Sequence, residues 1–155
     1  FCLSRGLGDV YKRQVIYAVV DETWRESVTS FVCKRAFVYE LKEASSFIGF
    51  VEDGKVIGGI LFTDYDGHNI YIHLALSTPR ICQRRFIRYM FDYCFKQLRC
   101  GRITAVTVEG KKRSERLIKG VGFTKEGIVR KGFNMKNKYV DAAVYGMLRE
   151  ECKWL

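Results

Sequence analysis

The stretch Ile70–Leu98, IYIHLALSTPRICQRRFIRYMFDYCFKQL, predicts a buried strand, a basic turn and an amphipathic helix in direct succession. Its first seven residues are rich in apolar and β-branched types, which is typical of a strand inside a sheet. Side chains alternate along a strand, so Tyr71, His73 and Ala75 share one face. From Phe86 onward the apolar residues recur at three- and four-residue spacing, which predicts a helix with one buried face.

The turn between this strand and this helix carries Arg80, Arg84 and Arg85. The first turn of a helix presents unpaired backbone N–H groups and the positive end of the helix dipole. Arginines beside it add charge and paired hydrogen-bond donors, so the arrangement suits a phosphate or pyrophosphate. A solvated basic turn with nothing bound is the plainer interpretation, and the stretch alone favours it.

The first fourteen residues, 1–14, have no hydrophobic period, and their ending DVYKRQ resembles a translated sequencing adaptor. We expect this segment to be an artefact, with a disordered tail as the alternative, and residues 15–155 to form one domain. The net charge of the chain is +10, and it falls to +8 without residues 1–14. A surface of this sign attracts phosphorylated cofactors, acidic substrates or nucleic acid, and it does not choose among them.

The six cysteines form no CxxC pair, and the two histidines lie apart from them in sequence. We therefore expect no zinc or other metal site. No disulfide framework is evident, which indicates a reducing, cytoplasmic setting. No apolar run approaches the ~20 residues of a membrane span, so we expect no membrane partner.

The remaining hydrophobic patterns predict strands at residues 15–20, 47–51, 56–62, 102–108, 123–132 and 139–148, and helices at about 24–42 and 114–121. Thr23 and Glu26 have the spacing of a capping box at the start of the first helix. Asp53-Gly54 between two apolar runs indicates a tight hairpin. Gly58-Gly59 inside the second run predicts a bulge or a close backbone approach.

The predicted order is therefore β-α-β-β-β-α-β-α-β-β. A helix links the strands at 70–76 and 102–108, so we expect them to be parallel neighbours and all other pairs to be antiparallel. The fold class is α/β or α+β, a mixed and mostly antiparallel sheet with helices on both faces. An exposed last strand, 139–148, would offer its edge to a second copy of the chain in a homodimer.

Over residues 15–155, this order and several motifs resemble the GNAT superfamily of acyl-CoA N-acyltransferases. Residues 114–130, SERLIKGVGFTKEGIVR, are similar to the family pattern S..L....GF..EG..R. The stretch from Asp141 to Leu148 is similar to the closing D..yyml strand. Phe91-Asp92-Tyr93 and the ending ECKWL resemble a subgroup found in phage and prophage genomes.

The resemblance implies an acetyl-CoA site in the opening between the parallel strands at 70–76 and 102–108. Backbone amides at the end of the first strand would pair with the pantetheine arm, and the following turn and helix start would hold the pyrophosphate. The cofactor-binding residues so implied are Leu74, Ala75, Leu76, Arg80, Gln83, Arg84, Arg85 and Phe86. Lys111 and Ser114 join them near the start of the short helix, although a solvated basic turn and an ordinary first-turn serine explain these two equally well.

The sequence departs from the family pattern at three places. The common loop is R-x-x-G-x-G/A, but Arg80–Arg85 contains no glycine, so side-chain cations would have to replace some backbone amides. Lys111 stands where the family often has asparagine. Ile118 stands where it often has a tyrosine that acts as general acid.

Acetyl transfer to an amine requires a proton acceptor, an aligned thioester and a donor for the developing oxyanion. His73 lies mid-strand in the right region, and an ordinary histidine has a pKa of about 6.5. Glu109, at the end of the parallel strand, is the second candidate base. Each has a structural interpretation too: a histidine hydrogen-bonded within the sheet, and a solvated turn carboxylate.

The leading hypothesis is an N-acetyltransferase that moves an acetyl group from acetyl-CoA to a primary amine by direct attack. The amine would belong to a protein N-terminus, a lysine or a small molecule, and the positive surface disfavours polycations. The alternative is a non-catalytic module of the same fold that binds CoA, a protein or nucleic acid, although no recognition-helix motif supports nucleic acid. If Arg80, Arg84 and Arg85 converge on the opening, the CoA-binding enzyme is favoured. If they spread over a convex face, the non-catalytic binding module is favoured.

Overall fold

The computed structural model describes residues 15–36 and 44–155. The predicted tail at 1–14 and the predicted end of the first helix, at 37–42, lie outside the described residues. The described strands are β1 (Tyr17–Val19), β2 (Ser46–Glu52), β3 (Lys55–Thr63), β4 (Asn69–Leu76), β5 (Arg102–Val108), β6 (Thr124–Met135) and β7 (Lys138–Leu148). The described α-helices are α1 (Arg25–Ala36), α2 (Arg84–Asp92) and α3 (Lys112–Val121), and the strands and α-helices follow the predicted order.

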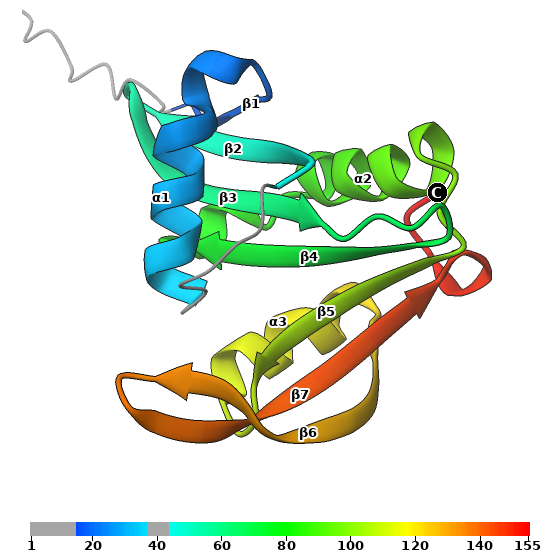
Figure 1. The fold of residues 1–155 in the computed structure, drawn as a ribbon. Coiled ribbons are helices and arrows are strands. Elements are labelled where there is room, and N and C mark those ends of the chain that lie inside the picture. Colours follow the sequence, from blue (N-terminus) through cyan, green and yellow to red (C-terminus); the bar gives the residue numbers. More distant parts are fainter. Residues whose placement is uncertain (1–14, 37–43) are drawn as a thin grey trace, which may run out of the picture.

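The strands form one sheet in the order β1-β2-β3-β4-β5-β7-β6 (Figure 1). Among the described strands only β4 and β5 pair in parallel, as predicted. Helix α1 covers β2, β3 and β4 on one face, and α2 and α3 lie on the other face. The predicted mixed, mostly antiparallel sheet with helices on both faces is confirmed.

The last strand does not lie at the edge of the sheet, so that prediction is wrong. β7 pairs with β6 on one side and with β5 on the other, which leaves β6 at the edge. Burial explains the arrangement, because β7 carries the fully buried Ala143, Tyr145 and Met147, whereas the first nine residues of β6 are exposed. The strand with the more apolar face takes the inner position.

Glycines let α1 approach the sheet closely. A Cβ on Gly49 would lie 2.5 Å from Val28 Cγ2, and one on Gly59 would lie 2.6 Å from Val28 Cγ1. Val28 and Val32 are completely buried in this contact. The predicted close backbone approach in β3 is confirmed, and the β2–β3 ladder also shifts register between Phe50 and Val51.

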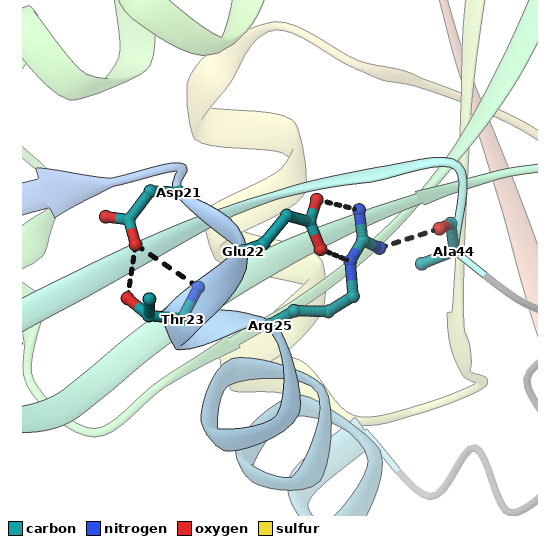
Figure 2. A network of polar contacts seen from close by, with 5 residues as sticks. All are labelled: Asp21, Glu22, Thr23, Arg25 and Ala44. Atoms are coloured by element: carbon teal, nitrogen blue, oxygen red, sulfur yellow. Dashed lines mark hydrogen bonds and ion pairs between the residues drawn. The ribbon is translucent and has the colours of Figure 1, made fainter.

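Helix α1 begins differently from the prediction. Asp21 caps a short 3-10 turn before α1, and its carboxylate accepts from the Thr23 backbone N–H at 3.2 Å and from the Thr23 hydroxyl (Figure 2). The predicted capping box is wrong because this carboxylate has already taken the threonine hydroxyl. Arg25 donates to Glu22 at 2.8 Å and to the carbonyl of Ala44 at 3.0 Å, which ties the start of α1 to the chain entering β2.

Helix α2 gives way after Asp92 to a π-helical turn over Tyr93–Gln97, where an α-helix to Leu98 was expected. The backbone N–H of Leu98 donates to the carbonyl five residues earlier at 3.0 Å. Cys94 and Phe95 are both completely buried. The turn therefore continues the buried face that Met90 and Phe91 form in α2.

Candidate active site

The opening between β4 and β5 begins where their parallel pairing stops. The last paired residues are Ile72 and Ala105. Beyond them β4 continues to Leu76 alongside β3, and β5 continues to Val108 alongside β7. Figure 1 shows the two strands diverging toward these ends. Each strand therefore has a free backbone edge that faces the opening.

Alternation along β4 identifies the amides on that edge. The carbonyl of His68 accepts a hydrogen bond of 2.9 Å from the segment that enters β5, and the N–H of Ser77 donates to β3 at 2.9 Å. Even-numbered residues therefore turn their backbone polar groups toward β5, and odd-numbered residues turn theirs toward β3. The N–H groups of Leu74 and Leu76 point into the opening, whereas that of Ala75 points to β3.

The first turn of α2 has no side-chain cap. Gln83 occupies the capping position, but its side chain donates to the carbonyl of Arg80 and accepts from Arg85, both at 2.9 Å. Among the described residues, the backbone N–H groups of Arg84 and Arg85 find no acceptor, while that of Phe86 donates to the Gln83 carbonyl at 3.0 Å. Two free N–H groups at the positive end of a helix are suited to binding an anion.

The three arginines of the loop neither converge on the opening nor spread evenly over a surface. Arg80 makes two hydrogen bonds of 2.7 Å to the carboxylate of Glu52, and this contact raises the arginine pKa. Arg85 donates to the carbonyl of Ile16 at 2.9 Å and lies over its neighbouring phenylalanine ring. Within the described part of the chain, Arg84 has no such partner and is exposed. Its guanidinium group is therefore open to solvent.

The β2–β3 hairpin shapes this glycine-free loop. The N–H and hydroxyl of Ser77 donate to the carbonyl of Ile57 at 2.9 and 2.6 Å. The buried Ile81 side chain fills the space over Gly58, where an added Cβ would lie 2.6 Å from Ile81 Cδ1. We call these contacts the loop clamp: Ser77 with Ile57, Ile81 with Gly58, and Arg80 with Glu52. The clamp fixes the loop beside the start of α2.

His73 lies in the half of β4 that borders the opening, and it is half-buried. Its Nε2 is 3.0 Å from the hydroxyl of Thr63, on the neighbouring strand. Burial lowers the pKa of His73, and the nearby Asp64 opposes that shift in part. The imidazole is therefore neutral near pH 7 and able to accept a proton, and the hydrogen bond also suits the structural role.

The other sequence-predicted site residues lie around the end of β5. Glu109 binds Lys125 through both carboxylate oxygens, at 2.8 and 2.9 Å, and this contact raises the lysine pKa. Lys111 immediately precedes α3, and Ser114 lies half-buried in the first turn of that helix. The carboxylate of Glu109 thus already has a cation, which sets it apart from His73 as a candidate base.

Sequence reasoning missed one polar group near this end of the sheet. Tyr145 of β7 is fully buried, and its hydroxyl has no hydrogen-bond partner among the described residues. Burial raises the pKa of this tyrosine, and the nearby Glu115 adds to the shift. The sequence placed Tyr145 on a strand, but nothing in it indicated an unpaired hydroxyl.

Two surface hollows lie away from the opening. One, of about 500 Å³, lies between α1 and the β2–β3 hairpin, and the other, of about 300 Å³, lies between β2 and the end of α2. Within the described residues, no three His, Cys, Asp or Glu side chains come together in a way that could hold a metal ion. No described helix is both long and apolar enough to cross a membrane.

Comparison with known proteins identifies relatives of this chain. A model of the acetyltransferase (GNAT) domain matches residues 22–144. The SPbeta prophage-derived uncharacterized N-acetyltransferase YokL of Bacillus subtilis (strain 168) is 29% identical over 115 residues, which is 71% of this chain and 65% of YokL. The probable N-acetyltransferase YjcK of the same organism is 30% identical over 104 residues, 67% of this chain and 56% of YjcK. The chain thus spans less than two thirds of these relatives.

Solved structures share the fold. The ribosomal-protein-S5-alanine acetyltransferase from Vibrio fischeri superposes with a TM-score of 0.68 at 16% identity, over 89% of this chain and 95% of that one. A mutant of the spermidine N-acetyltransferase SpeG from Vibrio cholerae gives a TM-score of 0.71 at 15% identity, over 90% and 96% of the two chains. The domain match covers most of the sequence, and the strand order and the divergence of β4 from β5 agree with it: the chain belongs to the GNAT acetyltransferase family.

Proposed function

We propose that this protein is an N-acetyltransferase that transfers an acetyl group from acetyl-CoA to a primary amine. The observation that carries the proposal is the uncapped start of α2, with the free N–H groups of Arg84 and Arg85, beside the free edge of β4. The helix start would bind the pyrophosphate, and the N–H groups of Leu74 and Leu76 would face the pantetheine arm or the thioester. Membership of the family supports acetyl-CoA as donor.

The reaction needs no covalent enzyme intermediate. The amine nitrogen attacks the thioester carbonyl carbon, the C–S bond breaks, and the CoA thiolate leaves and takes up a proton. A free N–H of β4 would donate to the oxyanion as it forms. His73 is our first choice to receive the amine proton, because its lowered pKa keeps it neutral near pH 7. Glu109 remains the second candidate, acting in contact with Lys125.

The non-catalytic alternative has a specific observation in its favour. Ile118 stands where a tyrosine acid is common in the family, and its side chain packs against the apolar core. Arg80 and Arg85 are also engaged by protein groups, which leaves fewer cations for the cofactor. Under this alternative the opening binds CoA or a partner without turnover.

Calorimetric titration of the full chain with acetyl-CoA tests the proposal first. We expect binding, weakened about tenfold by Arg84→Ala because one charge-assisted contact is lost. Arg88→Ala, which removes another exposed arginine one turn further along α2, is the matched control and should bind as the wild type does. An absence of binding at millimolar acetyl-CoA would contradict the proposal. If acetyl-CoA binds but no amine is acetylated, the non-catalytic module is the better description.

The biological setting stays a prediction. The prophage-derived relative supports the expected phage-type subgroup. A cytoplasmic location remains an expectation from the cysteine pattern. A homodimer would now form through the edge of β6 rather than through the last strand, because β6 is the outer strand.

A further inference from the structure

Positive charge is concentrated in one part of the chain. Residues 109–141 carry ten basic and four acidic side chains, so they supply +6 of the total net charge of +10. All four carboxylates are engaged within the protein: Glu109 with Lys125, Glu115 with the N–H of Gly110, Glu126 with Arg102, and Asp141 with the N–H of Lys131. Two of these contacts are with backbone N–H groups, so the carboxylates of Glu115 and Asp141 keep their negative charge, and Asp141 lies beside Lys131. The segment still has six more basic than acidic side chains.

Four of these cations lie on the outer part of the β6–β7 hairpin, residues 129–140, which we call the hairpin arm. Figure 1 shows the arm extending beyond the end of β5. Its basic residues are Arg130, Lys131, Lys136 and Lys138, all exposed. None of their side chains makes an ion pair within the described residues.

The hairpin arm borders an uncovered face of the sheet. On the side of α1, no described helix crosses β5, β7 and β6 (Figure 1). Val106, Val108 and Val144 on this face are only half-buried. The opening between β4 and β5 lies at one border of the face and β6 at the other. At a strand spacing of roughly 4.8 Å, β6 is about 10 Å from β5.

Building on the acetyltransferase function above, we propose that the acceptor is an amine on an acidic polypeptide. Its chain crosses the uncovered face, and its carboxylates meet the cations of the hairpin arm. An extended chain advances about 3.3 Å per residue, so the acidic residues lie about three to six positions from the acetylated amine. The same charge repels polyamines, so the acceptor differs from that named for the spermidine acetyltransferase of similar fold.

A polypeptide fits this surface better than nucleic acid does. Single-stranded nucleic acid binds platforms of several aromatic rings, whereas the described part of the hairpin arm offers one strongly exposed ring, Tyr139. The apolar floor formed by the valines of β5 and β7 suits peptide side chains. Nucleic-acid binding is therefore the competing outcome of the test.

The test uses the full chain loaded with CoA and labelled peptides that have one free N-terminal amine. Peptides with glutamate, glutamine or arginine at about positions four to six are compared by fluorescence anisotropy at two salt concentrations. We expect the glutamate peptide to bind at least about tenfold more tightly than the arginine peptide, and less tightly as salt rises. Arg130→Glu with Lys138→Glu should abolish the preference.

The matched control is Arg116→Glu with Lys119→Glu, which changes the net charge equally on α3, on the opposite face of the sheet. This variant should keep the preference for the glutamate peptide. With a peptide whose free amine the protein acetylates, the hairpin-arm variant should raise KM for that peptide and leave kcat unchanged, because the arm does not touch the thioester.

Equal binding of the glutamate and arginine peptides would overturn the proposal. Tight binding of a single-stranded oligonucleotide that the arm variant abolishes, without any peptide preference, would overturn it in favour of nucleic acid. Acidic-peptide binding to a chain that does not bind acetyl-CoA would support the surface and refute the acetyltransferase. Acetyl-CoA turnover without a preference for acidic peptides would support the acetyltransferase and refute the acidic acceptor.

Discussion

The two halves of the sheet on either side of the opening are stabilised in different ways. In β2 and β3 nearly every residue is buried or half-buried, because α1 covers one face and α2 the other. In β6 most residues are exposed, and the strand is held by its ladder to β7, which has two irregularities. The first half fixes the loop expected to bind the donor. The second half ends in an edge strand that no described helix covers on the side of α1.

The largest expected effect comes from adding a side chain at Gly58 in the first half, compared with the same change at Gly127 in the second half. Gly58→Val should cost about 1–3 kcal/mol of unfolding free energy and weaken acetyl-CoA binding, because the new side chain displaces Ile81 from the loop clamp. Gly127→Val in β6 is the matched control, since a Cβ there meets nothing within 4 Å. Denaturant unfolding and calorimetric titration measure both effects. An equal loss of unfolding free energy in the two variants would contradict the difference in packing between the two halves of the sheet.

Two tyrosine hydroxyls give the second comparison. Tyr145→Phe should stabilise the protein by about 1 kcal/mol, because it removes a buried hydroxyl without a described partner. Tyr93→Phe should instead destabilise it by about 1 kcal/mol, because the Tyr93 hydroxyl donates to Ser46 at 2.6 Å. Thermal and denaturant unfolding of both variants measure the difference. A clear loss of stability in Tyr145→Phe would show that its hydroxyl has a partner in solution.

The smallest expected effect concerns pH and His73. The folded protein lowers the pKa of this histidine, so the unfolded chain binds the proton more readily. Stability should therefore fall as the pH drops below the ordinary histidine pKa of about 6.5. His73→Gln should lose this part of the pH dependence when thermal unfolding is compared at pH of about 7.5 and about 5.5. An identical pH dependence in variant and wild type would mean that the imidazole titrates normally.

Much of the fold follows from local patterns. The strand range at residues 102–108 and the order of the described strands and α-helices agree with the prediction. The parallel pair agrees too, because a connecting helix permits little else. Local patterns could not place β7 between β5 and β6, since that choice depends on which of the two last strands has the more buried face in the assembled sheet. The start of α1 was misjudged because a carboxylate upstream competed for the same threonine.

The candidate site was less predictable than the fold. The basic turn and its position at a helix start were evident from the sequence, but the partners of its arginines were not. Arg80 pairs with a carboxylate 28 residues earlier, and Arg85 pairs with a carbonyl 69 residues earlier. Such contacts exist only once the hairpin and β1 have come together, so no local pattern encodes them. The free N–H groups of α2 were predictable in kind, because helix starts leave them unpaired.

The contact between Ile81 and Gly58 has a consequence for how such proteins are recognised. The small residue that lets this loop close tightly belongs to a strand more than twenty positions earlier, so the motif is divided between two distant parts of the chain. A search that scores the loop alone finds an isoleucine and no glycine, and it underrates the site. The informative unit is the pair of positions, and in the course of divergence each should limit which residues the other accepts.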